Sequence, residues 1–279
     1  MAPIRSFVRR YRFVAFVLLT FILTWVPWGI VTIELQTGRS PIVTPLILLG
    51  GFGPFLAAII VAVGGGDARS WFRNLVDVRA PLTVWIAAVL VPVVLYVGAL
   101  ALFIAFGGGF DRTGVLPAAA IPTVAFATLV RGGLEEPGWR GLALPVLQRR
   151  VGAFQASIVI GVIWAFWHVP LFLIPGSSQA GTPFALYAAV VIGISVITTW
   201  LYNVAGGRTL VAIVFHTLSN AVSVTTAGGV IGDEVASQIA LLVVVWTVVA
   251  ILVWRYDTDR LSPNALPEGG IDLSTPVTE

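Results

Sequence analysis

The feature that most constrains this chain is a series of apolar runs that contain no charged residue. Three of them cover 13–33, 40–66 and 80–106, and the region 151–207 carries no ionisable acid or base except His168. A helix needs about 20 apolar residues to cross a bilayer. Of all residues, 58% are hydrophobic and 10% are charged, against roughly 25% charged in a soluble domain. The sequence therefore predicts an all-α, polytopic transmembrane helical bundle whose surroundings are the lipid bilayer.

Glycine, proline and polar residues divide the apolar sequence into about eight expected helices. The region after residue 151 is too long for one helix, and the segment 175–183 splits it with prolines and glycines. The stretch 142–147 is too short to span and is expected to lie as a surface helix. We expect the spanning helices to cover 13–33, 40–66, 80–106, 117–136, 154–174, 183–203, 209–227 and 236–254.

The arginines indicate the orientation of this bundle. With eight helices and an inside N-terminus, thirteen of the 16 basic residues fall in cytoplasmic segments, while Arg39 and Arg112 fall in outer loops and Arg131 in the fourth span. Such a bias is what the positive-inside rule predicts. We expect a cytoplasmic segment at 1–12, a bundle at 13–255 with its functional core at about 117–227, and a disordered cytoplasmic tail at 256–279.

Composition also excludes several functions. The chain has no cysteine, so a disulfide framework, a thiolate metal site and a cysteine nucleophile are impossible. The net charge of +3 reflects arginines that follow the topology, and it gives no indication of nucleic-acid binding. No internal repeat is evident, which argues against, without excluding, a transporter built from inverted halves.

Two adjacent carboxylates stand at the end of the fourth apolar run, in Leu134-Glu135-Glu136-Pro137-Gly138-Trp139-Arg140-Gly141. Carboxylates in a membrane are costly unless they are paired or used. Glu136 and Arg140 are four residues apart, which places them within ion-pair reach on a helix. Glu135 points about 100° away and would be free to act as a base. The alternative is a salt cluster at a cytoplasmic helix end.

The only two histidines, His168 and His216, lie inside later apolar runs. At four-residue spacing, Trp164 shares a helical face with His168, and Asn220 shares one with His216. Interhelical hydrogen bonds that fix packing would explain such residues. Inside a membrane helix, however, an ionisable side chain more often marks a functional site.

Together these residues have the chemistry for hydrolysis. A carboxylate base, two imidazoles, an amide and an arginine can activate water and stabilise an oxyanion. Glu135, His168 and His216 could also bind zinc and leave a position for water. The His-Glu-x-x-His motif of zinc proteases and the Gly-x-Ser-x-Gly motif of serine hydrolases are both missing.

The same residues resemble the CPBP intramembrane proteases, a family that includes the CAAX prenyl proteases of the Rce1 type and bacterial abortive-infection proteins. That family carries Glu-Glu-x-x-x-Arg, Phe-x-x-x-His and His-x-x-x-Asn or Asp on separate helices. The first motif is matched at 135–140, the second at His168 with Trp164 in place of phenylalanine, and the third at His216 and Asn220. The similarity covers roughly 117–227.

The resemblance implies an endopeptidase that hydrolyses a peptide bond in a cavity open to the cytosol. It implies that Glu135 and His168 activate water and that His216 and Asn220 stabilise the oxyanion. Glu136 and Arg140 would hold the site in shape. The substrate would be a prenylated CAAX-like tail, another membrane protein or a small peptide, in a multi-pass protein of the bacterial plasma membrane. No cofactor is firmly implied; zinc remains possible, although a metal-free mechanism is favoured.

Two other functions use the same residues. A membrane transporter or proton relay could be built on a buried Glu and His cluster, and would need two access pathways. A non-catalytic scaffold or bacteriocin-immunity protein would retain the fold without turnover.

Overall fold

The computed structural model describes residues 2–37, 42–267, 270, 271 and 273, and is nearly all helical there. In that part of the chain, seven helices are long and apolar enough to cross a membrane, and one bent pair would make an eighth. The predicted polytopic bundle is therefore confirmed. Arg39, placed above in an outer loop, lies outside the described residues.

The described chain is built mainly from helices, joined by connections of different lengths. The principal helices are α1 (Ala2–Thr37), α2 (Val43–Gly51), α3 (Gly53–Gly65), α4 (Ala68–Leu75), α5 (Leu82–Ala105), α6 (Ile121–Arg131), α7 (Glu136–Gly138), α8 (Leu144–Val151), α9 (Ala153–Trp167), α10 (Phe184–Val204), α11 (Thr209–Ala227) and α12 (Glu234–Arg255). Two strands, β1 (Gly109–Phe110) and β2 (Val230–Ile231), pair antiparallel. Short turns of 3₁₀-helix are η1 (Arg112–Gly114), η2 (Ala118–Ala120), η3 (Gly133–Glu135) and η5 (Val169–Leu173), and η4 (Trp139–Ala143) is a π-helical turn.

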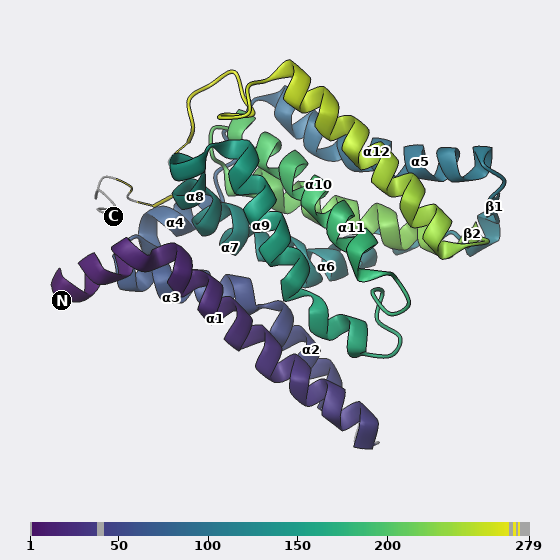
Figure 1. Cartoon of the computed structure of the whole chain (residues 1–279), viewed down its shortest axis with the longest axis horizontal. Coiled ribbons are helices and arrows are strands. Elements are labelled where there is room, and N and C mark those ends of the chain that lie inside the picture. The colour runs from purple at the N-terminus through teal and green to yellow at the C-terminus, as the bar shows by residue number, and fades with distance from the viewer. Residues whose placement is uncertain (1, 38–41, 268–269, 272, 274–279) are drawn as a thin grey trace.

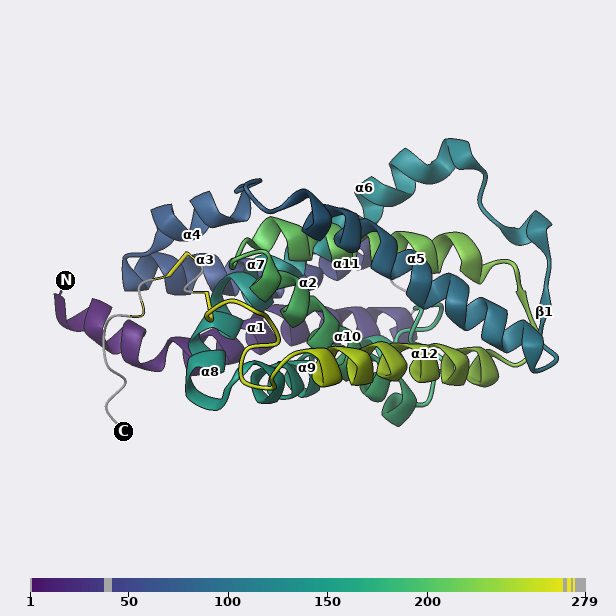
Figure 2. The same ribbon diagram turned by 90° about the horizontal axis from the view of Figure 1, so that it is seen from above.

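The two ends of the bundle differ in composition. The start of α1, α4, α8 and the described C-terminal segment gather at one end, and the β1–β2 ribbon lies at the other (Figure 1, Figure 2). The first end holds most of the arginines, including Arg149 and Arg150 at the close of α8. This agrees with the expected orientation, in which both termini are on the cytoplasmic side.

The expected second span is a bent pair, α2 and α3, which meet at 47° around Phe52. Glycines allow α1 to pack closely against both. A Cβ at Gly50 would lie 2.3 Å from the Trp28 indole, and one at Gly53 would lie 1.9 Å from the Thr24 hydroxyl. The small residues in this run thus serve close helix approach, as expected in a membrane bundle.

The fourth span is not the single helix that we predicted over 117–136. Helix α6 ends at Arg131, and the chain continues through η3, α7 and η4 into α8. The break falls at Gly132 and Gly133, where α11 approaches too closely for a side chain: a Cβ at Gly133 would lie 2.2 Å from the Thr217 hydroxyl. Glu135 therefore leaves the line of α6 and turns into the bundle.

Two further segments differ from the expectation. The stretch 142–147 was expected at the surface, but Leu142, Ala143 and Leu144 are buried in the core. The tail was expected to be disordered, yet its described part packs back on the bundle, with Leu261 and Ile271 buried. The Ser70 hydroxyl donates to the Gly270 carbonyl at 2.7 Å, so this segment lies against α4. Residues 268, 269, 272 and 274–279 lie outside the description.

Candidate active site

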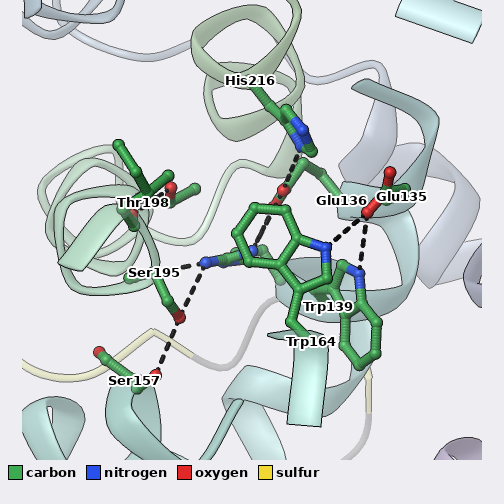
Figure 3. Close-up of polar contacts among 10 residues, drawn as sticks. Glu135, Glu136, Trp139, Ser157, Trp164, Ser195, Thr198 and His216 are labelled. Atoms are coloured by element: carbon green, nitrogen blue, oxygen red, sulfur yellow. Dashed lines mark hydrogen bonds and ion pairs between the residues drawn. The ribbon is translucent and has the colours of Figure 1, made fainter. Parts of the chain in front are cut away.

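The residues singled out from the sequence come from three parts of the chain. Glu135, Glu136 and His216 lie close together inside the bundle (Figure 3), and Trp164, which binds Glu135, also contacts His168. Glu135 and Glu136 stand on η3 and α7, His168 follows the last residue of α9, and His216 lies in the first half of α11. All four side chains are buried. The structure thus brings together charged and polar groups that are far apart in the sequence.

The second carboxylate, Glu136, is held by two partners. Arg140 Nη1 lies 3.1 Å from each of its oxygens, as the four-residue spacing predicted. His216 Nδ1 lies 2.8 Å from Glu136 Oε1. A carboxylate only accepts hydrogen bonds, so Nδ1 carries a proton and Nε2 of His216 faces away from Glu136. Glu136 therefore fixes the orientation of His216.

The first carboxylate, Glu135, is held by two indoles. Trp164 Nε1 donates to Glu135 Oε2 at 2.7 Å, and Trp139 Nε1 does so at 3.4 Å. Both donors engage Oε2, which leaves Oε1 as the oxygen that these indoles do not hold. Sequence reasoning missed this arrangement, and treated the tryptophan at 164 only as an aromatic replacement for phenylalanine. Phenylalanine has no N–H to donate to a carboxylate.

Trp164 also contacts both histidines. Its carbonyl oxygen lies 2.8 Å from His168 Nδ1, and because a carbonyl only accepts, Nδ1 is the protonated nitrogen. In the neutral ring, Nε2 of His168 then carries the free lone pair. The indole ring lies edge-on to His216, with centroids 5.2 Å apart, and the Arg140 guanidinium stands 5.2 Å from its centre. Trp164 is thus the residue around which the site is built.

Two potential hydrogen-bond donors lie against the position that a side chain at residue 132 would occupy. A Cβ at position 132 would lie 2.2 Å from Asn220 Nδ2 and 3.0 Å from His216 Nε2. These atoms belong to the two residues of the His-x-x-x-Asn motif, one turn apart on α11. Because residue 132 is glycine, no side chain of its own occupies this position. Two donors that converge on one point can hold a developing oxyanion.

Other elements support the Glu-Glu segment from outside. Trp71 Nε1 on α4 donates to the Pro137 carbonyl at 3.2 Å. Gly138 packs directly on α3, where a Cβ would lie 2.5 Å from the Pro54 carbonyl oxygen. The π-helical turn η4 follows immediately and carries Arg140. Such turns occur often at functional sites, and this one begins at Trp139, inside the Glu-Glu-x-x-x-Arg motif.

The zinc set considered above, Glu135, His168 and His216, does not form a ligand cluster in this structure. Within the described residues, no group of three or more His, Asp or Glu side chains is placed to hold a metal ion. We therefore derive no chemical step through a metal.

Comparison with known proteins agrees with this site. The family model described as type II CAAX prenyl endopeptidase Rce1-like matches residues 117–222. CAAX prenyl protease 2 of Methanococcus maripaludis is 28% identical over 223 residues, which cover 72% of this chain and 80% of that protein. Lysostaphin resistance protein A of Staphylococcus haemolyticus is 28% identical over 168 residues, or 58% of this chain and 44% of that protein. This chain thus matches less than half of the second relative's length.

The fold and the site together define the class of protein. It is a multi-pass helical membrane protein with a buried centre of glutamate, arginine and histidine side chains. Residues 117–222, which contain all three motifs, match the model of the Rce1-like family of CAAX prenyl endopeptidases. The resemblance inferred from the motifs is therefore confirmed. The roles of the individual residues remain predictions.

Proposed function

We propose that this protein is an intramembrane endopeptidase that hydrolyses a peptide bond with a water molecule activated by Glu135 and His168. The observation that carries the proposal is the convergence on Trp164 and Gly132. Trp164 binds the carboxylate of Glu135 and the ring of His168, while His216 and Asn220 lie beside Gly132. The candidate base Glu135 and the candidate oxyanion donor His216 therefore both contact the indole of Trp164.

The proposed reaction follows from these atoms. Glu135 accepts a proton from water, with His168 Nε2 as a hydrogen-bond acceptor that orients it. The water oxygen bonds to the carbonyl carbon, and the carbonyl oxygen becomes an oxyanion between His216 Nε2 and Asn220 Nδ2. Glu135 then gives its proton to the amide nitrogen as the carbon–nitrogen bond breaks. The products are a carboxylic acid and an amine, which become a carboxylate and an ammonium group when the proton of the acid passes to the amine.

Charge balance supports this assignment of roles. To donate from Nε2 as well as Nδ1, His216 must be protonated. With His216 positive, the two carboxylates of Glu135 and Glu136 are balanced by the charges of His216 and Arg140, so the buried site has no net charge. Burying unbalanced charge in an apolar bundle is costly. Because the charges of Glu136 and Arg140 cancel, this pair can hold the His216 ring in place without changing the net charge of the site.

The substrate class is the finer part of the proposal. A prenylated CAAX-like peptide is suggested by the name of the Methanococcus relative, and a membrane protein or a small peptide would suit the same chemistry. A non-catalytic role in resistance is the second candidate, favoured by the likeness to a lysostaphin resistance protein. In that case the protein would protect by binding, and the Glu and His side chains would be needed only for the fold.

The test is proteolysis by the purified protein in liposomes, on a quenched prenylated peptide and on a pool of membrane peptides. Wild type is compared with Glu135→Gln and His168→Asn, and with Glu234→Gln, a matched control at the exposed start of α12. The proposal expects cleavage by wild type and the control, with loss of at least about 10²-fold in the two site variants. Cleavage that persists in both would contradict it, and loss on adding a metal chelator would contradict the metal-free mechanism.

A further inference from the structure

Helix α10 carries none of the three motifs, yet it contributes a buried polar side chain to the site. Ser195, near the middle of α10, is fully buried. Its side chain and main chain both contact Arg140, and its hydroxyl also reaches Ser157 (Figure 3). Arg140 Nη2 lies 3.1 Å from Ser195 Oγ and 3.3 Å from its carbonyl oxygen. A serine in an apolar helix has no sequence signal that would distinguish it from the other serines and threonines of α10.

These contacts belong to a continuous chain of hydrogen bonds across three helices. Ser195 Oγ donates to the Ser157 carbonyl of α9 at 2.9 Å and accepts from Arg140. Arg140 donates to Glu136, and Glu136 accepts from His216 Nδ1 at 2.8 Å. Because the Ser195 proton goes to a carbonyl, the lone pairs of Oγ are directed at the guanidinium. The chain thus runs from the backbone of α9 to the imidazole of α11.

We propose that Ser195 is a positioning residue, which acts on His216 through Arg140 and Glu136. The guanidinium is planar, so fixing Nη2 on α10 fixes the plane in which Nη1 meets Glu136. That carboxylate in turn sets the rotation of the His216 ring and the direction of Nε2. In a buried network, losing one partner affects the others, because no water replaces the missing contact. The positioning role of Ser195 does not depend on catalysis. Only the expected change in kcat rests on the proposed function.

The first experiment replaces Ser195 with alanine in the full-length protein in liposomes. Thr198→Val is the matched control, because Thr198 is also buried on α10 but donates only to the Ile194 carbonyl of its own helix, at 2.7 Å. We expect kcat to fall about 10-fold or more in Ser195→Ala, as for loss of a hydrogen bond to a charged group, with KM unchanged. Thr198→Val should retain the wild-type kcat.

The second measurement does not depend on activity. The chain has only two histidines, so selective ¹⁵N-histidine labelling reports the ring nitrogens of His168 and His216 alone. We expect Ser195→Ala to shift the His216 nitrogen signals and to leave those of His168 unchanged, while Thr198→Val shifts neither. Unchanged His216 signals in Ser195→Ala would overturn the inference, whether or not any peptide is cleaved.

A second variant guards against a fold defect. Ser195→Cys keeps nearly the same volume but offers only a weakly polar sulfur, and should move the His216 signals in the same direction. A shift in Ser195→Ala that is absent in Ser195→Cys would also overturn the inference, because the change would then come from a cavity. If wild type cleaves nothing while the His216 signals respond as expected, the proposed function fails and the positioning role stands.

Discussion

Replacing Gly132 with alanine should abolish most of the activity while leaving the fold intact. A Cβ at position 132 would lie 2.2 Å from Asn220 Nδ2, about 1.2 Å closer than an ordinary contact, which begins at 3.4 Å. Asn220 is only partly buried, and its amide is the end of a flexible side chain. The amide is therefore expected to swing away and relieve the overlap, at the cost of its place in the oxyanion site.

The size of the effect follows from this displacement. A misplacement of about 1 Å costs roughly 10²-fold in rate, and removal of one oxyanion donor costs about 10²–10³-fold in kcat. We therefore expect kcat of Gly132→Ala to fall by at least about 10²-fold.

The assay compares kcat for peptide cleavage in liposomes among four proteins. Gly29→Ala is the control, because a Cβ at Gly29 in α1 meets nothing within 4 Å. Gly132→Ala and Asn220→Ala both remove the same donor, so their effects on kcat should not add. The double variant is therefore expected to be about as active as Asn220→Ala alone. A Gly132→Ala enzyme as active as Gly29→Ala, in the same assay, would refute the placement of the oxyanion site.

Three further outcomes follow from the contacts. Trp164→Phe removes the indole N–H that binds the candidate base, and kcat should fall about 10- to 100-fold; unchanged kcat would show that the indole is dispensable. Asp67→Asn breaks the buried pair with Arg12, 3.3 Å apart, and should lower the unfolding free energy by about 3 kcal/mol, seen as a lower Tm in detergent; an equal Tm would argue against the pair. The Arg79 guanidinium holds the pKa of Asp77 well below its ordinary value, so ionised Asp77 stabilises the fold above about pH 4 and this contribution is lost as pH falls further. The Tm difference between wild type and Asp77→Asn should thus shrink from pH 7 to pH 3, and a constant difference would exclude this cause.

The sequence predicted the parts of the molecule that depend on local pattern. Charge-free runs gave the spans, and the (i, i+4) spacing gave the Glu136–Arg140 ion pair, now seen with 3.1 Å contacts. The two histidines could be assigned to one site because an ionisable group in an apolar run needs a partner. These inferences use only distance along the chain and the properties of lipid.

The parts that could not be predicted depend on which helices face one another. Neither the spacing nor the composition indicates that Ser195 meets Arg140, or that Trp164 binds Glu135. The end of α6 at Arg131 was also missed, because the run stays apolar through Leu129 and Val130 and the reason for the break is the approach of α11 at Gly132 and Gly133. Such contacts are set by tertiary packing rather than by periodicity.

The most direct test of the account is the fate of the water oxygen. Wild type and Glu135→Gln, in liposomes prepared in H₂¹⁸O, are given a peptide that wild type cleaves, and the mass of the N-terminal fragment, which carries the new carboxylate, is measured at early times. The account predicts one ¹⁸O atom in the newly formed carboxylate, and a loss of at least about 10²-fold in the amount of product with Glu135→Gln. An unlabelled product, or labelled product formed equally fast by Glu135→Gln, would contradict hydrolysis by water that Glu135 activates.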